Sequence, residues 1–137
     1  MKIFLKEDDF NQIVKFAKTS VPEEACGLIA GTKTEAEKRI EKVYFLTNID
    51  HTSEHFSLDP AEQLSAVKDM RRLGYKPLGN WHSHPQTPSR PSAEDIRLAY
   101  DSTASYLILS LADADNPVLN SFHVENGCVE KEELVML

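Results

Sequence analysis

The N-terminal third of the chain combines helical and strand-like patterns of apolar residues. Residues 3–5 form a short apolar segment that predicts a strand, and the apolar residues after it have the spacing of one helical face, ending near Ser20. A compact apolar run at 25–30 predicts a buried strand. The stretch 38–49, rich in strand-forming side chains, should pair with it in antiparallel fashion across the connection 33–37. The residues of the helical face are Phe10, Ile13, Val14 and Ala17.

Capping signals predict a second helix in the middle of the chain. Asp59 suits the N-cap, Pro60 the first helical position, and Glu62 stands three residues after the cap. Gly74 should end this helix, because glycine is the residue most often found just past a helix C-terminus. Its expected buried residues are Leu64, Val67, Met70 and Leu73. Before it, residues 48–54 have the composition of a loop and residues 56–58 predict a short strand.

The second half of the chain continues this mixture of strands and helices. Residues 77–84 predict a strand, 92–100 a short helix and 106–111 a central strand. Residues 118–134 predict a hairpin, because Asn-Gly at its middle is the strongest short turn signal. The order predicts an α/β protein with a mixed sheet between helices, in one domain that spans residues 1–137.

Composition narrows the range of partners and compartments. The net charge is -7, so a nucleic-acid backbone or an anionic membrane would be repelled by most of the surface. No apolar run approaches the roughly 20 residues that span a bilayer, and the N-terminus lacks the apolar core of a signal peptide. Two cysteines, Cys26 and Cys128, do not make a disulfide framework. We therefore expect a cytoplasmic protein with reduced thiols.

Side chains with metal-binding chemistry gather in residues 81–95. If the backbone is extended, His82 and His84 point to the same face of their strand. The prolines that follow keep the chain out of helix until Ser92, and Asp95 then lies in the first helical turn. Two imidazoles and one carboxylate are the ligand set of a catalytic zinc site. However, Ser92 and Asp95 also fit a capping box without any metal, and the residues alone leave both interpretations open.

The pattern His82-x-His84-Pro, then Ser92-x-x-Asp95, resembles the signature of the JAMM (MPN-plus, or JAB) zinc metalloproteases. That family also has a glutamate well upstream, in a Glu-x-x-Gly context before an apolar strand. Here the corresponding segment is Glu24-Ala25-Cys26-Gly27. The resemblance spans nearly the whole chain and is closest to the minimal prokaryotic members. It implies a curved mixed sheet flanked by helices, similar to that of the cytidine deaminases.

The resemblance also implies a role for each residue. His82, His84 and Asp95 would hold one Zn²⁺ with a water in the fourth position, and Glu24 would activate that water. Ser92 would donate a hydrogen bond to the oxyanion of the intermediate. The offset to Gly27 selects Glu24 over Glu23.

The expected substrate is the bond after the C-terminal Gly-Gly of a ubiquitin-like or sulfur-carrier protein. Its tail would add as a strand near residues 55–58. The sequence indicates neither whether that bond is peptide or isopeptide, nor the oligomeric state.

Three other functions compete with this one. A thiol nucleophile at Cys26 is disfavoured because the residue lies in an apolar run that predicts a buried strand. A resemblance to the RadC-type proteins linked with DNA repair conflicts with the acidic charge and the upstream Glu-x-x-Gly. A non-catalytic MPN scaffold would lack the ligands.

Several nearby residues have expected structural roles. Trp81 is expected in the core and Ser83 is expected to point away from the histidines, which disfavours a serine triad. His51 and His55 are expected at the surface or on the substrate side, and His123 at an ordinary strand position.

Overall fold

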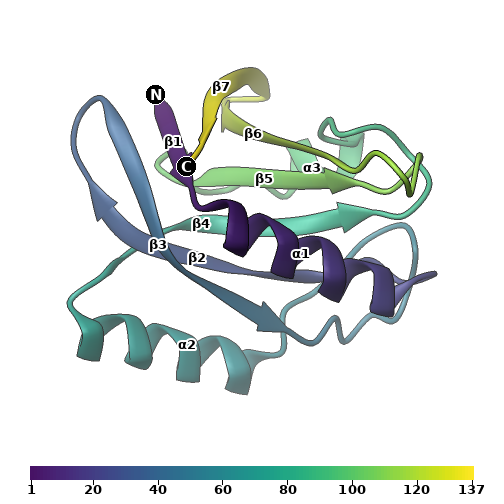
Figure 1. Cartoon of the computed structure of the whole chain (residues 1–137), viewed down its shortest axis with the longest axis horizontal. Helices are drawn as coiled ribbons and strands as arrows, with labels where there is room; N and C mark the ends of the chain where they lie inside the picture. Colours follow the sequence, from purple (N-terminus) through teal and green to yellow (C-terminus); the bar gives the residue numbers. More distant parts are fainter.

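A computed structural model describes all residues, 1–137, and its main element is a strongly curved sheet (Figure 1). Three helices accompany the sheet: α1 (Glu7–Ser20), α2 (Pro60–Leu73) and α3 (Ala93–Arg97). The strands are β1 (Lys2–Leu5), β2 (Cys26–Lys33), β3 (Glu37–Leu46), β4 (Lys76–His84), β5 (Ser105–Ser110), β6 (Val118–Glu125) and β7 (Cys128–Met136).

The sheet is mixed, as the order of elements predicts. Neighbouring strands follow the order β1-β3-β2-β4-β5-β6-β7, and β1 also pairs with β7, so the sheet closes on itself. The pairs β4–β5, β1–β3 and β1–β7 are parallel, and the other pairs are antiparallel. The antiparallel pairing of β2 with β3 and the central place of β5 were both predicted and are confirmed.

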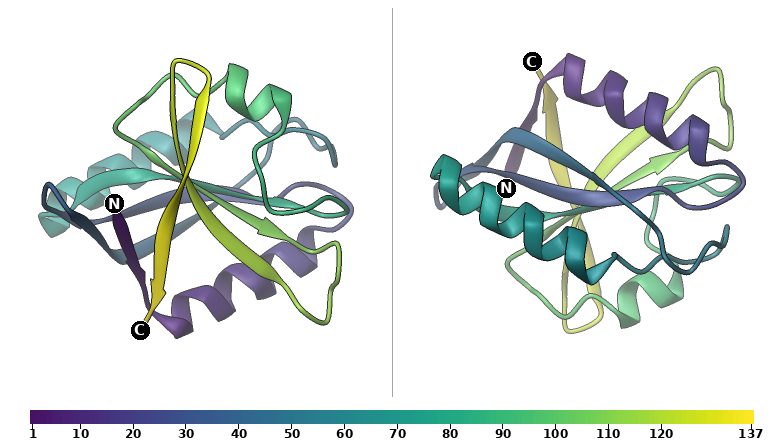
Figure 2. Two further views of the ribbon diagram at one scale, coloured as in Figure 1. Left: turned by 90° about the horizontal axis from the view of Figure 1, so that it is seen from above. Right: turned by 90° about the horizontal axis from the view of Figure 1, so that it is seen from below.

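The two long helices cover opposite faces of the sheet (Figures 1 and 2). The side chains of strand β2 alternate between these two faces. Ile29 belongs to the large core that includes Ile13 and Ala17 of α1. Its neighbour Ala30 packs instead with Ala66 and Met70 of α2. The predicted buried face of α1 is therefore confirmed, with Ile13 and Ala17 fully buried.

Local signals at the turns and helix ends are also confirmed. Asp59 caps α2 by accepting hydrogen bonds from the backbone N–H groups of Ala61 and Glu62 at 2.9 and 3.2 Å. Gly74 ends that helix in the left-handed conformation, with φ of 75°. The hairpin β6–β7 turns at Asn126 and Gly127, which both have positive φ as a tight two-residue turn requires. No helix of the structure is both long and apolar enough to cross a membrane.

Three details of the sequence prediction are wrong. Leu64 and Leu73 are exposed by 56% and 39%, because α2 buries only the narrow stripe around Ala66 and Met70 against the sheet. Residues 56–58 form no strand. Leu58 takes part only in an isolated bridge with Asn48. Finally, α3 is a helix of five residues that ends at Arg97 rather than near residue 100.

Candidate metal centre

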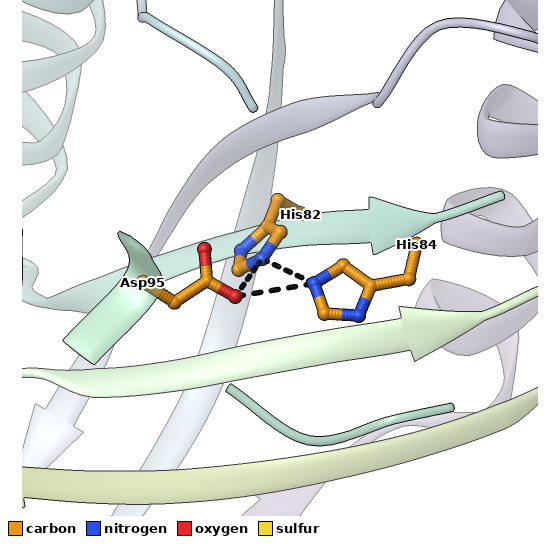
Figure 3. Close-up of side chains that lie close together, drawn as sticks. All are labelled: His82, His84 and Asp95. Atoms are coloured by element: carbon orange, nitrogen blue, oxygen red, sulfur yellow. Dashed lines mark hydrogen bonds and ion pairs between the residues drawn. The ribbon is translucent and has the colours of Figure 1, made fainter. Parts of the chain in front are cut away.

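Strand β4 and helix α3 bring His82, His84 and Asp95 together, as Figure 3 shows. The two histidines are two residues apart on β4, and their side chains project from the same face of the sheet. Asp95 reaches them from the first turn of α3, which lies across that face. Their ligand atoms all lie within 4.8 Å of one another. The predicted ligand set is therefore assembled by one strand and one helix cap.

The geometry of the cluster fits a bound cation. The Nε2 atoms of His82 and His84 lie 3.1 Å apart, and Asp95 Oδ2 lies 3.2 Å from the first and 3.1 Å from the second. His84 Nδ1 lies 3.0 Å from the carbonyl oxygen of Pro88. Because a carbonyl only accepts hydrogen bonds, that Nδ1 carries the proton and leaves the Nε2 lone pair facing the cluster. Such a set of convergent nitrogen and carboxylate donors suits Zn²⁺.

The ring of His82 is held in a different way. Its Nδ1 is buried and has no hydrogen-bond partner in the protein. Instead, Phe56 stacks on the imidazole, with ring centroids 4.6 Å apart and an angle of 26° between the planes. Metal-binding histidines usually donate their second N–H to a polar group that fixes the ring. In this protein an aromatic ring, rather than a polar group at Nδ1, packs against the imidazole of His82.

Ser92 and Asp95 form the predicted capping box. Ser92 Oγ accepts the backbone N–H of Asp95 at 3.0 Å, and Asp95 Oδ2 accepts the backbone N–H of Ser92 at 2.9 Å. The same Oδ2 faces both histidines. The cap and the cluster therefore share one carboxylate oxygen, and the two interpretations of this motif are compatible.

The cluster shifts the pKa values of its members in opposite directions. Burial works to raise the pKa of Asp95, but its contacts with His82 and His84 outweigh burial and hold that pKa well below its usual range. Burial lowers the pKa of His82. For His84, burial also acts to lower the pKa, but Asp95 and the Pro88 carbonyl raise it above the usual value. A carboxylate that stays ionised beside a neutral imidazole is suited to metal binding.

Glu24 lies beside this cluster. Cys26 of β2 pairs with His82 of β4, and the Ser83 N–H donates to the Ala25 carbonyl. This antiparallel register places Glu24 opposite His84. Glu24 is only 4% exposed, whereas the side chain of Glu23 is 40% exposed and contacts His51. Burial raises the pKa of Glu24 to about 8, against the attraction of His84. A carboxyl group that exchanges its proton near neutral pH is suited to general base chemistry.

Steric crowding explains why the Glu-x-x-Gly segment has glycine at position 27. A Cβ atom on Gly27 would lie 1.8 Å from the Tyr44 carbonyl oxygen and 2.3 Å from Trp81 Nε1. Trp81 is fully buried in the core and packs edge-on against Phe16 and Phe45, as its predicted core role requires. Gly27 thus leaves room for the hydrogen bond from Trp81 Nε1 to the Tyr44 carbonyl of β3.

Two residues considered as nucleophiles have structural roles. Ser83 is fully buried on the face of β4 opposite the histidines, where its Oγ accepts the backbone N–H of Ala25 at 2.8 Å. Cys26 is also fully buried, and burial raises the pKa of its thiol to about 12. A thiol with that pKa is almost never ionised at neutral pH and is a poor nucleophile. Burial and these contacts make both residues unsuited to act as nucleophiles, which agrees with the sequence prediction.

A cavity of about 210 Å³ opens beside the cluster. Its walls are mostly apolar, with Leu98 from the end of α3 and Ile108 from β5, and His82 and Asp95 form its polar side. His55 lines the same cavity and is partly exposed, and exposed His51 contacts Glu23, so the expected surface position of both histidines is confirmed. Such a small apolar cavity with a few convergent polar groups is typical of a binding site.

Sequence reasoning missed three residues of this region: Asn48, Phe56 and Asn80. Phe56 is the one aromatic residue in a polar loop, and that isolation is a signal of contact. Asn80 lines the cavity with a buried Oδ1 that lacks a partner, and its even spacing from His82 places it on the same face. Asn48 gives little local signal, because only its contact with the Asp50 N–H is near in sequence and its contact with Glu24 spans 24 positions.

Comparison with known proteins agrees with this geometry. The chain is 32% identical over 130 residues to the CysO-cysteine peptidase of Mycobacterium tuberculosis, covering 95% of this chain and 88% of that one. It is 33% identical over 73 residues to a desampylase of Pyrococcus furiosus, covering 53% of this chain and 49% of the relative. These similarities support the predicted enzyme class, a hydrolase acting on peptide or isopeptide bonds.

The fold and the family are shown independently. The solution structure of a Desulfitobacterium hafniense protein superposes with a TM-score of 0.91 at 47% identity, covering 100% of this chain and 93% of that one. Residues 6–124 match the family model described as prokaryotic homologs of the JAB domain. The chain therefore belongs to the prokaryotic JAB-domain family, the minimal form of the fold that its His-x-His and Ser-x-x-Asp pattern predicts.

Proposed function

We propose that this protein is a zinc-dependent peptidase or isopeptidase that cleaves the bond after the C-terminal Gly-Gly of a small ubiquitin-like or sulfur-carrier protein. The observation that carries the proposal is the convergence of His82 Nε2, His84 Nε2 and Asp95 Oδ2 beside a buried carboxylate that has an unpartnered oxygen, Glu24 Oε1. A buried carboxylate without a partner is costly to the fold. We attribute its presence to catalysis.

In this proposal His82, His84 and Asp95 hold the metal, one ion per chain. When bound, Zn²⁺ supplies Lewis acidity and makes hydroxide available near neutral pH. Glu24 takes a proton from the attacking water and delivers it to the leaving amine. Its raised pKa, about 8, suits both steps, and a neighbouring cation would lower that pKa toward the working pH.

Ser92 is proposed to stabilise the oxyanion of the tetrahedral intermediate. Its Oγ already accepts the N–H of Asp95, so the hydroxyl hydrogen is free to donate to the substrate. The cap fixes the hydroxyl beside the cluster before substrate arrives. A donor fixed in this way stabilises charge on the reaction path without having to reorganise.

The substrate class follows from the names of the relatives and from the cavity. The mycobacterial relative is named a CysO-cysteine peptidase and the Pyrococcus relative a desampylase. Both names fit enzymes that act at the tail of a small carrier protein. The apolar cavity beside His82 and Asp95 offers a place for the residues of such a tail. The expected strand addition near residues 55–58 is not supported, because that segment is a loop with a single isolated bridge.

Neither competing function gains support from a structural observation. A non-catalytic scaffold does not need Glu24 buried and unpartnered beside three convergent donors. A nucleic-acid substrate conflicts with the net charge of -7. We also propose that the chain acts as one domain in the cytoplasm, because β1 and β7 pair across its two ends and both cysteines are free.

The test is cleavage of carrier fusions that end in Gly-Gly, Gly-Ala or Ala-Ala before the scissile bond, with products identified by mass spectrometry. Cleavage directly after Gly-Gly, and much slower cleavage of the other two, is expected. Equal cleavage of all three fusions would leave only a general zinc peptidase. A zinc-loaded protein that cleaves none of them would refute the proposed function.

A further inference from the structure

The loop between β3 and α2, residues 47–58, contacts both the candidate base and a candidate metal ligand. Its ends are joined by the bridge between Asn48 and Leu58 and by the bond from Ile49 N–H to the Ser57 carbonyl at 3.0 Å. Within it, four successive residues, 55–58, line the cavity beside the cluster. Phe56 also stacks on His82. This loop therefore forms part of the wall against which a bound tail would rest.

Asn48 organises the loop from inside. Its side chain is buried, and its Oδ1 accepts the backbone N–H groups of Asp50 and Ser57 at 3.0 and 3.1 Å. Its Nδ2 donates to the carbonyl oxygens of Glu24 and His55 at 3.0 and 3.2 Å. All four hydrogen-bonding positions of the amide are thus used. A fully satisfied buried amide fixes the geometry of every group that it contacts.

The contact with Glu24 is important because both backbone hydrogen bonds of that residue go to the loop. Its backbone N–H donates to the Thr52 carbonyl at 2.8 Å, and its own carbonyl accepts from Asn48 at 3.0 Å. The loop therefore holds the Glu24 backbone on both sides. By contrast, Oε1 of the Glu24 carboxylate is buried without a partner. The place of the carboxylate is consequently set by the backbone, which the loop holds at Glu24 and strand β4 holds at Ala25 through Ser83.

We propose that Asn48 is a positioning residue, through which the cavity-lining loop holds Glu24 in its working place, so that a tail bound in the cavity steadies the base. This inference rests on the proposed function for its catalytic consequence, but the positioning itself is a property of the fold. Asn48 does not touch the reacting atoms. It joins a wall of the binding site, at His55 and Ser57, to the residue that moves the proton.

The test uses Asn48→Asp, which keeps the acceptor for Asp50 and Ser57 but replaces the donor to Glu24 and His55 with a second oxygen. The matched control is Asp59→Ala, which removes the N-cap of α2 next to the loop and has no contact with Glu24. Hydrogen exchange of individual backbone amides is measured by NMR in the zinc-loaded proteins. We expect the Glu24 amide to exchange at least about tenfold faster in Asn48→Asp only.

Turnover of a Gly-Gly carrier fusion gives the second measurement. Asn48→Asp should lower kcat by about tenfold or more while KM changes by less than about threefold, because a misplaced base slows chemistry rather than binding. The ratio of variant to parent activity should rise as the pH falls, since a protonated carboxyl can again donate. Asn48→Ser, which is too short to reach Glu24, replaces Asn48→Asp if that variant does not fold.

The outcomes separate the two proposals. Unchanged exchange at Glu24, or equal acceleration in the control, overturns the positioning role whatever the activity. Faster exchange at Glu24 together with unchanged kcat also overturns it. Faster exchange in a protein whose parent cleaves no carrier fusion supports the positioning contact and refutes the proposed function instead.

Discussion

Ser92 and Asp95 hold each other through two reciprocal hydrogen bonds, from Asp95 N–H to Ser92 Oγ at 3.0 Å and from Ser92 N–H to Asp95 Oδ2 at 2.9 Å. The oxygen that closes this capping box also faces His82 and His84. The cap at the start of α3 and the candidate metal centre therefore share the same carboxylate oxygen of Asp95. A change at either residue should affect both the fold and the chemistry, and the two effects can be measured separately.

Replacing Ser92 by alanine should lower stability by about 1 kcal/mol through loss of the cap. It should also lower kcat by about a hundredfold with little change in KM, because the hydroxyl acts only on the reaction path. Thermal unfolding and steady-state kinetics measure the two effects. Asp59→Ala, which removes a similar cap from α2, should lose stability but keep kcat. If both variants lose kcat equally, Ser92 has only a structural role.

The metal centre predicts about one zinc per chain in protein purified without chelator. The double variant His82→Ala/His84→Ala should lose this zinc, because only Asp95 of the three donors would remain. A chelator should lower the Tm of the parent, since a ligand bound to the folded state stabilises it. Elemental analysis and calorimetry are the measurements. His123→Ala, at a site where the ring contacts the Ser102 carbonyl, should keep its zinc. Zinc at full occupancy in the double variant would exclude this site.

Glu24→Gln should retain zinc and fold normally while losing activity by a factor of about 10² to 10⁴. Its stability should not fall, because Oε1 of the carboxylate is buried without a partner and a neutral amide costs less to bury. Glu23→Gln is the control, and it should behave like the parent because that side chain is exposed. Equal loss of activity in the two variants would show that the wrong glutamate has been assigned.

Phe56→Ala should weaken zinc binding by about tenfold, because groups that orient a ligand histidine have effects of this size. The stacking of Phe56 on His82 is the contact that would be lost. Competition with a chromophoric chelator measures the affinity, and Phe56→Tyr, which keeps the ring, should bind zinc like the parent. Unchanged affinity in Phe56→Ala would mean that the strand alone orients His82.

The sequence by itself determined the features that depend on neighbours in the chain. The alternation of side chains on a strand puts His82 and His84 on one face, and the cap chemistry of Ser92 starts the helix that carries Asp95. The turn at Asn126 and Gly127 and the start of α2 at Asp59 and Pro60 were determined in the same way. These features are local because the backbone conformations they need are set by residues close in sequence.

Only the tertiary structure decided the features that depend on what each segment packs against. Helical spacing suggested that Leu64 and Leu73 are buried, but α2 contacts the sheet through Ala66 and Met70 and leaves both leucines exposed. Glu23 and Glu24 have the same side chain, and only the resemblance to the family, through the offset to Gly27, separates them in sequence. The register of β2 with β4 buries Glu24 and leaves Glu23 outside, and Asn48 reaches Glu24 across 24 positions. The burial of these residues depends on pairing between distant segments, and the periodicity of the sequence does not reveal that pairing.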